Sequence, residues 1–376
     1  MKIGILSYQQ VRNFGAVLQN YALQKALESI NNAVEVETID YRCKYLDNGY
    51  NKRMLTEGRK GILDYSIKDL VKSMIVYPLY KKREKVFESY LTNHIKRSST
   101  IRDKNELIML NESYDYFVVG SDQVWNFEII LDDYTYFLDF VNDSKKKISY
   151  AASLCWKYSH EKNKDLLIKY LGDFSAISVR EEKDAIKLKS YIKNIVNVNI
   201  DPTLLLTTEE WNKAEEEVEN IPEKYILFFE LLNANVAVDL ARSKSKELNI
   251  PIIYISSDDK PWKYKDMIHI HNINPGQFIR LVENSSYVYT NSFHGVMFSL
   301  LYHKPFYCQQ TNGDRRMEDA LKLVGIGDFY IRDAYGINML NDSDQLWESF
   351  EKKVKEQREI SKLYLLESLS SLKMEG

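Results

Sequence analysis

The sequence predicts an α/β protein of two Rossmann-like halves, each a doubly wound parallel sheet, and three observations lead to this fold class. The chain has 376 residues, whereas one domain has about 150, so two domains are expected. Short apolar runs alternate with helical stretches in both halves, as they do in βαβ units. A charged, helix-prone connector at 207–223 ends in Ile-Pro-Glu and indicates a domain boundary.

The elements follow in order from the spacing of apolar residues. In an N-terminal domain, 1–205, we expect a strand at 2–6, a helix at 16–30, and strands at 34–39, 116–119 and 147–151. In a C-terminal domain, 206–340, we expect strands at 225–229, 252–255, 268–269 and 287–289, with helices at 236–248, 275–283 and 296–301. Within 341–376, a last helix at about 344–372 has heptad-like apolar positions and is expected to pack back across both domains.

Composition favours a globular protein and argues against several functional classes. The net charge is −3, with 28% charged and 44% hydrophobic residues, which does not suit a nucleic-acid binder or a disordered tail. The first ten residues enter a β run without the features of a signal peptide, and no apolar stretch reaches about 18 residues. Three cysteines at unrelated spacings suggest neither a disulfide framework nor a zinc site. We therefore expect a cytoplasmic protein.

A basic insertion at 51–104 interrupts the first half. It holds 14 Lys or Arg residues against 6 Asp or Glu residues, and its apolar residues recur at helical spacing before the run Lys81-Lys82-Arg83. Two interpretations are open. A helical hairpin with a solvated basic face is common in soluble domains. A peripheral membrane helix has the same pattern.

Four loops hold the polar residues from which a site can be built, because parallel sheets bind ligands beyond the carboxyl ends of their strands. The first loop, 7–15, ends in Asn13-Phe14-Gly15, and the second, 120–126, reads GSDQVWN. The third places Arg180 at the end of a β-like run, and the fourth contains His294. One chain thus supplies a carboxylate, cations and a histidine.

The His294 loop joins an apolar strand to a helix. Residues 290–292 are turn or N-cap residues, so His294 and Gly295 fall in the first helical turn. Backbone N–H groups there, with the positive end of the helix dipole, favour a phosphate or carboxylate. The alternative for such a motif taken alone is a core histidine that caps a buried helix.

With these motifs together, the chain resembles the polysaccharide pyruvyl transferase family, whose members place pyruvate from phosphoenolpyruvate onto sugar hydroxyls as a ketal. The resemblance extends over most of the chain and is carried by NFGAVLQ at 13–19, YAL at 21–23, VGSDQVWN at 119–126, YAAS at 150–153, SVRE at 178–181, DPTLL at 201–205, TNSFHG at 290–295 and the pair Arg315-Arg316. The order and spacing of these motifs are specific together. The basic insertion matches least.

The resemblance implies a GT-B-like fold, with two Rossmann-like domains that face a cleft, and no metal or cofactor. The acceptor side is expected in the N-terminal domain and the donor side in the C-terminal domain. The phosphoenolpyruvate-binding arginine of the family matches Arg180, and its cleft histidine matches His294. One departure is Ser292, where better studied members carry an arginine, so Arg315 or Arg316 is expected to supply that charge.

Three residues are predicted to carry the chemistry. We expect His294 to be the acid or phosphate partner, Arg180 the anion clamp and Asp122 the base. Substrate-binding residues are expected at Asn13, Gly15, Ser121, Gln123, Ser292, Phe293, Gly295, Arg315 and Arg316. Structural alternatives remain open: Arg180 as a surface ion-pair residue, Asp122 as a helix cap, and Trp125 as a core residue rather than a stacking platform for sugar.

The leading hypothesis is transfer of pyruvate from phosphoenolpyruvate to a hydroxyl pair of a surface-polysaccharide or capsule precursor. That acceptor is expected to be lipid-linked at the inner face of the membrane, which would give the basic insertion a purpose. One rival is a nucleotide-sugar glycosyltransferase of the GT-B type that places a diphosphate at the helix of His294. Another is a non-catalytic glycan-binding homologue.

Overall fold

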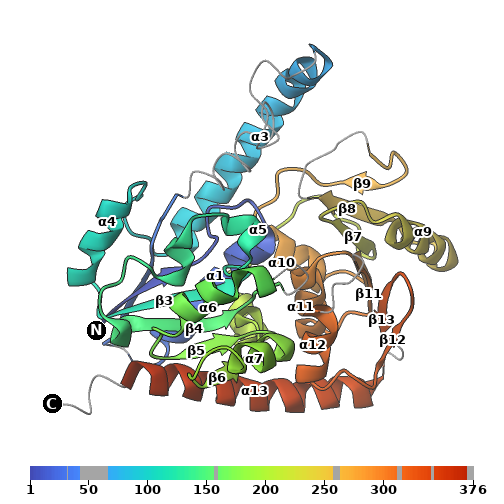
Figure 1. The fold of residues 1–376 in the computed structure, drawn as a ribbon. Coiled ribbons are helices and arrows are strands. Elements are labelled where there is room, and N and C mark those ends of the chain that lie inside the picture. The colour runs from blue at the N-terminus through green and yellow to red at the C-terminus, as the bar shows by residue number, and fades with distance from the viewer. Residues whose placement is uncertain are drawn as a thin grey trace.

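Two sheets lie side by side, and one long helix runs along both of them (Figure 1). The computed structural model describes residues 1–31, 33–42, 67–155, 160–256, 263–310, 316–339 and 343–370. The α/β class and the two Rossmann-like halves, expected from the sequence, are confirmed.

Among the described residues the first sheet has six parallel strands in the order β2-β1-β3-β4-β5-β6. Its strands are β1 (Lys2–Leu6), β2 (Glu35–Thr38), β3 (Tyr116–Asp122), β4 (Lys147–Ala152), β5 (Ile177–Val179) and β6 (Val196–Val198). The helices of this half are α1 (Phe14–Glu28), α3 (Ile67–His94), α4 (Lys104–Met109), α5 (Phe127–Ile130), α6 (Lys164–Leu171) and α7 (Glu182–Lys189). Short 3-10 turns are η2 (Leu110–Glu112), η3 (Tyr134–Phe137), η4 (Ser144–Lys146), η5 (His160–Asn163) and η6 (Pro202–Leu204).

The second sheet has seven strands in the described part of the chain, in the order β12-β13-β11-β10-β7-β8-β9. Its elements are α8 (Thr208–Trp211), β7 (Ile226–Glu230), α9 (Asn235–Leu248), β8 (Ile252–Ser256), β9 (Ile268–His269), α10 (Pro275–Glu283), β10 (Tyr287–Thr290), α11 (Phe293–Leu301), β11 (Phe306–Gln309), α12 (Arg316–Leu323), β12 (Tyr330–Arg332) and β13 (Gly336–Met339). The sheet is parallel except for β12 and β13, an antiparallel pair at one edge that the sequence did not predict.

Two segments differ from expectation. The strand expected at 116–119 continues to Asp122, because Gly120 and Asp122 still pair with β4. Gly120 has a φ of +125°, and a Cβ there would lie 2.1 Å from the Tyr150 carbonyl oxygen, so glycine is required. In the connector at 207–223 only α8 is an α-helix, because glutamates beyond it pair with other elements, as Glu215 does with Arg280 of α10 at 3.1 Å.

A hydrophobic cluster shared by the two halves includes Phe14 at the start of α1. The Phe14 ring stacks on Phe278 of α10, with centroids 4.9 Å apart, and on Phe87 of α3 at 5.4 Å. Phe229 at the end of β7 lies at 5.6 Å. Since Phe14 and Phe278 belong to different halves, the start of α1 is fixed against the second sheet as well as the first.

Helix α3, from the basic insertion, contributes to the same junction. Arg83 is buried; its Nη1 donates to the Ser256 carbonyl oxygen at 3.1 Å, and its guanidinium lies over the Phe14 and Phe87 rings at 5.2 and 5.0 Å. Because Arg83 is buried, the run Lys81-Lys82-Arg83 does not form one solvated face. A guanidinium tolerates this position because it packs favourably against aromatic rings. Residues 51–66 of the insertion lie outside the described residues.

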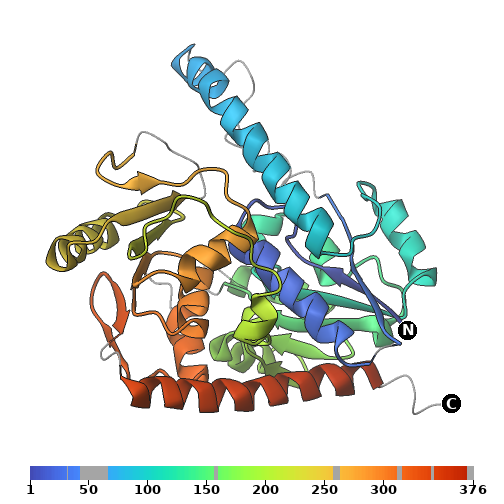
Figure 2. The ribbon, with the colours of Figure 1, turned by 180° about the vertical axis from the view of Figure 1, so that it is seen from behind.

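The last helix, α13 (Asp344–Ser370), joins both halves (Figure 2). Tyr364 donates its hydroxyl to the Ser149 carbonyl oxygen of β4 at 2.7 Å. Near its other end, Ser349 donates to the Gly325 carbonyl oxygen at 3.2 Å, just after α12. Its middle carries Arg358, whose Nε donates to the Leu204 carbonyl oxygen at 2.6 Å. Among the described residues no helix has the length and apolarity needed to span a membrane.

Candidate active site

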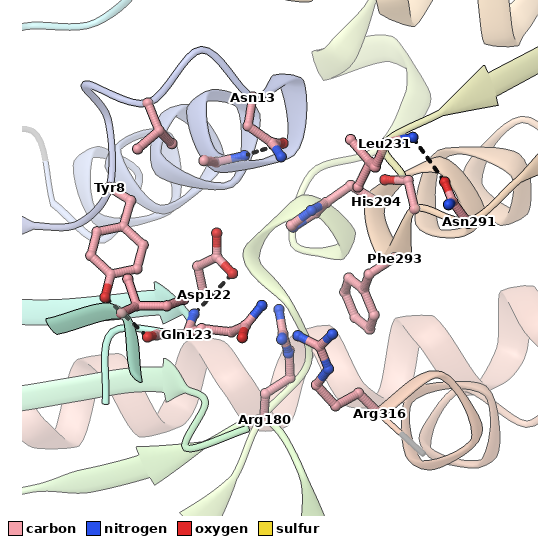
Figure 3. A pocket seen from close by; sticks show the side chains of 14 residues that line it. Tyr8, Asn13, Asp122, Gln123, Arg180, Leu231, Asn291, Phe293, His294 and Arg316 are labelled. Atoms are coloured by element: carbon pink, nitrogen blue, oxygen red, sulfur yellow. Dashed lines mark hydrogen bonds between the residues drawn. The ribbon is translucent and has the colours of Figure 1, made fainter. Parts of the chain in front are cut away.

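A cavity of about 150 Å³ lies between the halves, where the carboxyl ends of strands from both sheets meet (Figure 3). Its lining comprises Tyr8, Val11, Asn13, Ala16, Asp122, Gln123, Ile129 and Arg180 from the first half, and Leu231, Asn291, Ser292, Phe293, His294 and Arg316 from the second. Its position is the one in which parallel α/β sheets bind ligands. Each half therefore supplies part of any site formed there.

Arg180 follows β5 and is held by two buried carboxylates. Its Nε donates to Glu181 Oε1 at 3.0 Å, and its Nη1 donates to Asp201 Oδ2 at 2.9 Å. The guanidinium lies 4.2 Å from the centre of the Phe293 ring of the second half. Burial disfavours its charge, but Glu181, Asp201 and Asp122 outweigh burial and raise the pKa of Arg180. The Arg180 guanidinium is thus permanently charged, and its orientation is fixed by the two carboxylates.

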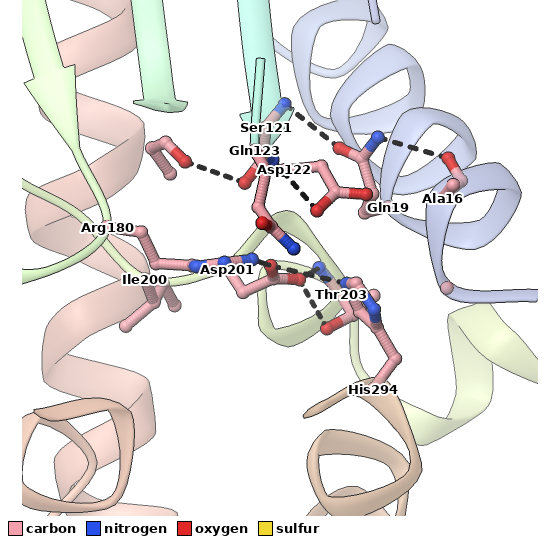
Figure 4. A network of polar contacts seen from close by, with 12 residues as sticks. Ala16, Gln19, Ser121, Asp122, Gln123, Arg180, Ile200, Asp201, Thr203 and His294 are labelled. Carbon is pink, nitrogen blue, oxygen red and sulfur yellow. Dashed lines mark hydrogen bonds and ion pairs between the residues drawn. The ribbon is translucent and has the colours of Figure 1, made fainter. Parts of the chain in front are cut away.

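Asp201 connects Arg180 with His294 (Figure 4). Its Oδ2 lies 3.5 Å from His294 Nε2, while its Oδ1 accepts from the Thr203 backbone N–H at 3.0 Å and from the Thr203 hydroxyl at 2.7 Å. Burial would raise the pKa of Asp201, but attraction to His294 and Arg180 prevails and lowers that pKa below its ordinary value. Asp201 is therefore a buried anion, 2% exposed, that lies between the Arg180 guanidinium and the His294 ring.

His294 occupies the first turn of α11, as the sequence predicts, and it is buried against the other half. Ser292 caps the helix by accepting from the Gly295 N–H at 3.2 Å. Across the junction, a Cβ added to Gly15 of α1 would lie only 2.0 Å from His294 Nδ1. Gly15 is therefore the residue that leaves room for the imidazole.

Asp122 ends β3 on the opposite wall, and its carboxylate points into the space between the halves (Figure 3). Its φ is 74°, a left-handed conformation that an aspartate adopts uncommonly. The carboxylate accepts from the Gln123 N–H at 2.8 Å. Behind it, the buried Gln19 side chain accepts from the Ser121 N–H at 2.9 Å and donates to Ser7 Oγ at 2.7 Å. This network fixes the end of the strand and hence the direction of Asp122.

Most of the predicted site residues line one cavity. Those that line it are Asn13, Asp122, Gln123, Arg180, Ser292, Phe293, His294 and Arg316. Gly15, Ser121 and Gly295 lie behind the wall, where they contact His294, Gln19 and Ser292 respectively. Arg315 lies outside the described residues.

The structural alternatives have clear outcomes. Arg180 is 3% exposed, so it is not a surface ion-pair residue. Asp122 caps no helix, because Asn126 provides the cap of α5. Trp125 is a core residue: it is fully buried, and its indole N–H donates to the Tyr136 carbonyl oxygen at 3.0 Å.

Two buried residues of the site were not predicted. Asp201 and Gln19 both stand within motifs that carry the resemblance, but neither was given a role. The local signal at Asp201 is that of a cap before Pro202, which is structural. A buried helical glutamine such as Gln19 has no local signal at all. Tyr8 and Asn291, which also line the cavity, had only their positions after strands to indicate them.

The fold and the site define a two-domain α/β protein of the GT-B-like type, with its cavity between the domains. A model of the family described as polysaccharide pyruvyl transferase matches residues 13–308. The chain therefore belongs to the polysaccharide pyruvyl transferase family, whose general activity is the transfer of pyruvate to a polysaccharide. A search of curated proteins found no match.

Solved structures resemble the chain in fold. A UDP-GlcNAc 2-epimerase from Methanocaldococcus jannaschii has a TM-score of 0.49 at 16% identity, over 94% of this chain and 92% of that one. A candidate UDP-N-acetylglucosamine 2-epimerase from Listeria monocytogenes has a TM-score of 0.50 at 12% identity, over 97% and 90%. Arabidopsis thaliana UGT89C1 complexed with quercetin has 0.44 at 9%, over 98% and 93%. At such identities the likeness concerns the fold alone.

Proposed function

We propose that the cavity binds phosphoenolpyruvate and that the protein transfers its pyruvate to a pair of sugar hydroxyls, forming a ketal on a surface-polysaccharide precursor. One observation carries the proposal. Arginines from both halves, Arg180 and Arg316, line the same cavity as His294. The donor bears a carboxylate and a phosphate, and guanidinium groups suit both anions because they bind them through paired N–H donors.

Arg316 takes the place of the arginine that is absent at Ser292. Both residues line the cavity, and Arg316 opens α12 while Ser292 caps α11. The donor is thus held by a fixed cation, Arg180, on the first half and by a second cation on the other. Such a division lets each half contribute positive charge to one small anion.

The reaction requires a proton on the methylene carbon of the donor and removal of a proton from the sugar. His294 gives its ring proton to the methylene carbon, so that a C–H bond forms as an N–H bond breaks. A sugar hydroxyl oxygen then bonds to the central carbon while its proton passes to Asp122. These are general acid and general base steps, and the arginines stabilise the phosphate as its charge develops.

The second hydroxyl closes the ring. The bond between the central carbon and the phosphate oxygen breaks, and the second sugar oxygen takes its place. Of the two hydroxyl protons, one replaces the proton lost by His294 and the other leaves with phosphate, so the cycle balances without an oxidant or reductant. Neither step needs a metal or a further cofactor.

Replacing Arg316 by glutamine is expected to weaken the binding of phosphoenolpyruvate roughly 10- to 100-fold, since a hydrogen bond to a charged group contributes about 1.5–3 kcal/mol. Calorimetry and thermal shift measure this, because a ligand at about 100 times its dissociation constant stabilises a protein by roughly 2.7 kcal/mol. Arg102→Gln, a change at an exposed arginine away from the cavity, serves as the matched control.

A panel of sugar nucleotides tests the rival activity with the same variants. If a sugar nucleotide stabilises the wild-type protein and phosphoenolpyruvate does not, the donor assignment is wrong and the cavity is that of a glycosyltransferase. If neither ligand binds, a non-catalytic glycan-binding role becomes the better explanation.

We further propose that the acceptor is lipid-linked and that α3 brings this cytoplasmic protein to the inner face of the membrane. Its first turns project away from both sheets, and Lys81 and Lys82 are exposed on it (Figure 1). Basic residues are attracted to anionic lipid by about 1 kcal/mol each.

Co-sedimentation with phosphatidylserine vesicles is expected at low salt, with less at high salt because ions screen the attraction. Lys81→Glu with Lys82→Glu should reduce it, whereas the paired change at Lys352 and Lys353 of α13 should not. Equal sedimentation of both double variants, or none for the wild type at low salt, would leave α3 as a helix that only joins the two halves.

A further inference from the structure

Asp201 has no part in the steps above, yet it is the carboxylate nearest to both the acid and the anion clamp. One oxygen, Oδ2, lies 2.9 Å from Arg180 Nη1 and 3.5 Å from His294 Nε2. The other oxygen is fully engaged by the backbone and hydroxyl of Thr203. Two hydrogen bonds on Oδ1 therefore fix the direction in which Oδ2 points.

The distance of 3.5 Å between Asp201 Oδ2 and His294 Nε2 is within the range of an ion pair and at the upper limit for a hydrogen bond. Among the described residues, His294 Nε2 is buried and has no hydrogen-bond partner. A buried polar nitrogen that lacks a partner is uncommon and costs free energy unless something binds to it. Since His294 lines the cavity, the missing partner is expected to come from the ligand.

We propose that Asp201 is a positioning residue: it stabilises the protonated ring of His294 by charge, without taking its hydrogen bond, so that the Nε2–H is left for the bound donor. The inference rests on the proposed function, because it assigns the donor to that N–H. The carboxylate offsets the positive charge that the ring bears whenever it is protonated. Because the same oxygen holds Arg180, it also sets the spacing between the acid and the anion clamp.

The charges around His294 support this assignment. Asp201, the cap of η6, lies against the ring, and the same carboxylate binds Arg180, whose charge opposes that of a protonated ring. Asp122 and Arg316 line the same cavity from β3 and α12. The start of α1 contributes Gly15, which bears no charge. Asp201 is therefore the carboxylate placed against the ring to offset the two arginines.

The test is the pH titration of the His294 ring in protein labelled with ¹⁵N-histidine and free of ligand. The chain has 6 histidines, and His294→Gln identifies the signal. In Asp201→Asn the ring is expected to lose its proton at a pH lower by about one unit or more, since an opposite charge at this distance shifts titration by about 1–3 units. Asp103→Asn, which keeps a cap on α4 far from the cavity, should leave the signal unchanged.

A second variant covers the case in which Asp201→Asn does not fold. Thr203→Val removes the hydroxyl that donates to Oδ1 and leaves the charge of Asp201 in place. Because Oδ2 is then held less firmly against the ring, the titration of His294 is expected to shift in the same direction by a smaller amount. If the ring titrates at the wild-type pH in a folded Asp201→Asn protein, Asp201 has only a structural role. If the shift occurs and phosphoenolpyruvate still fails to bind the wild type, the positioning role stands and the donor assignment falls.

Discussion

Replacing Gly15 by alanine is expected to reduce the release of phosphate from phosphoenolpyruvate at least a hundredfold while the protein stays folded. The new Cβ would lie 2.0 Å from His294 Nδ1 and 2.3 Å from its Cγ, so the ring must move. A displacement of about 1 Å in a catalytic group costs roughly 100-fold in rate. In the first turn of an unobstructed helix the same change would stabilise the protein, because alanine is the better helix former.

Phosphate release, measured with a panel of hexose disaccharides as acceptors, gives the rate, and thermal unfolding gives the stability. Gly327→Ala is the matched control, because its added Cβ would meet its nearest atom, Lys322 Cγ, at 3.4 Å, an ordinary contact. Where no disaccharide is used, the displaced ring is detected in its ¹⁵N signals. A Gly15→Ala protein with wild-type rate and unchanged ring signals would mean that α1 shifts instead of His294.

Replacing Arg180 by alanine is expected to lower the free energy of unfolding by about 3–5 kcal/mol, in addition to abolishing donor binding, because breaking a buried ion pair leaves uncompensated charge. Glu181 and Asp201 are both buried, and each loses its guanidinium partner. Lysine would not rescue the site, because one ammonium cannot reproduce bonds from both Nε and Nη1.

Urea unfolding measures this loss. The control is Arg242→Ala, which removes a half-buried arginine that binds Asp266 through two bonds of 2.8 Å and is expected to cost less than about 1 kcal/mol. Similar losses in the two variants would indicate that water already solvates the Arg180 cluster. A failure of Arg180→Ala to bind the donor can result from the lost cation or from the lost stability. Arg316→Gln is therefore the cleaner test of donor binding.

The architecture could be predicted from the sequence because helices and strands are indicated by the local spacing of apolar residues. The apolar run at 287–289 and the helical spacing that follows it predicted β10 and α11, with the cap within 290–292 and His294 in the first turn; the structure places the cap at Ser292. The predicted strand ends located the loops. Because ligands bind beyond the carboxyl ends of parallel strands, Asp122, Arg180 and His294 were expected to share a site, and all three line one cavity.

What escaped prediction depends on contacts between residues distant in the chain. Nothing near Gly15 indicates that His294 will lie against it, and nothing near Asp201 indicates that Arg180 and His294 will both contact it. Arg83 looked like one of three basic surface residues, because a run of charges does not reveal which member is buried among aromatic rings. Such residues acquire their roles only when both sheets are in place.

The path of α13 bears on how the chain folds during its synthesis. Strands β3 and β4 emerge early, but Tyr116 of β3 donates to the Leu369 carbonyl oxygen at 2.8 Å, and Asn199 after β6 donates to Ser361 Oγ at 3.1 Å. Both acceptors belong to α13, which leaves the ribosome after the strands of both sheets. Domains commonly fold from the N-terminus as they are made. Here the first sheet stays uncovered along that side until α13 has been made, and a nascent chain that stalls before α13 exposes it to chaperones and proteases.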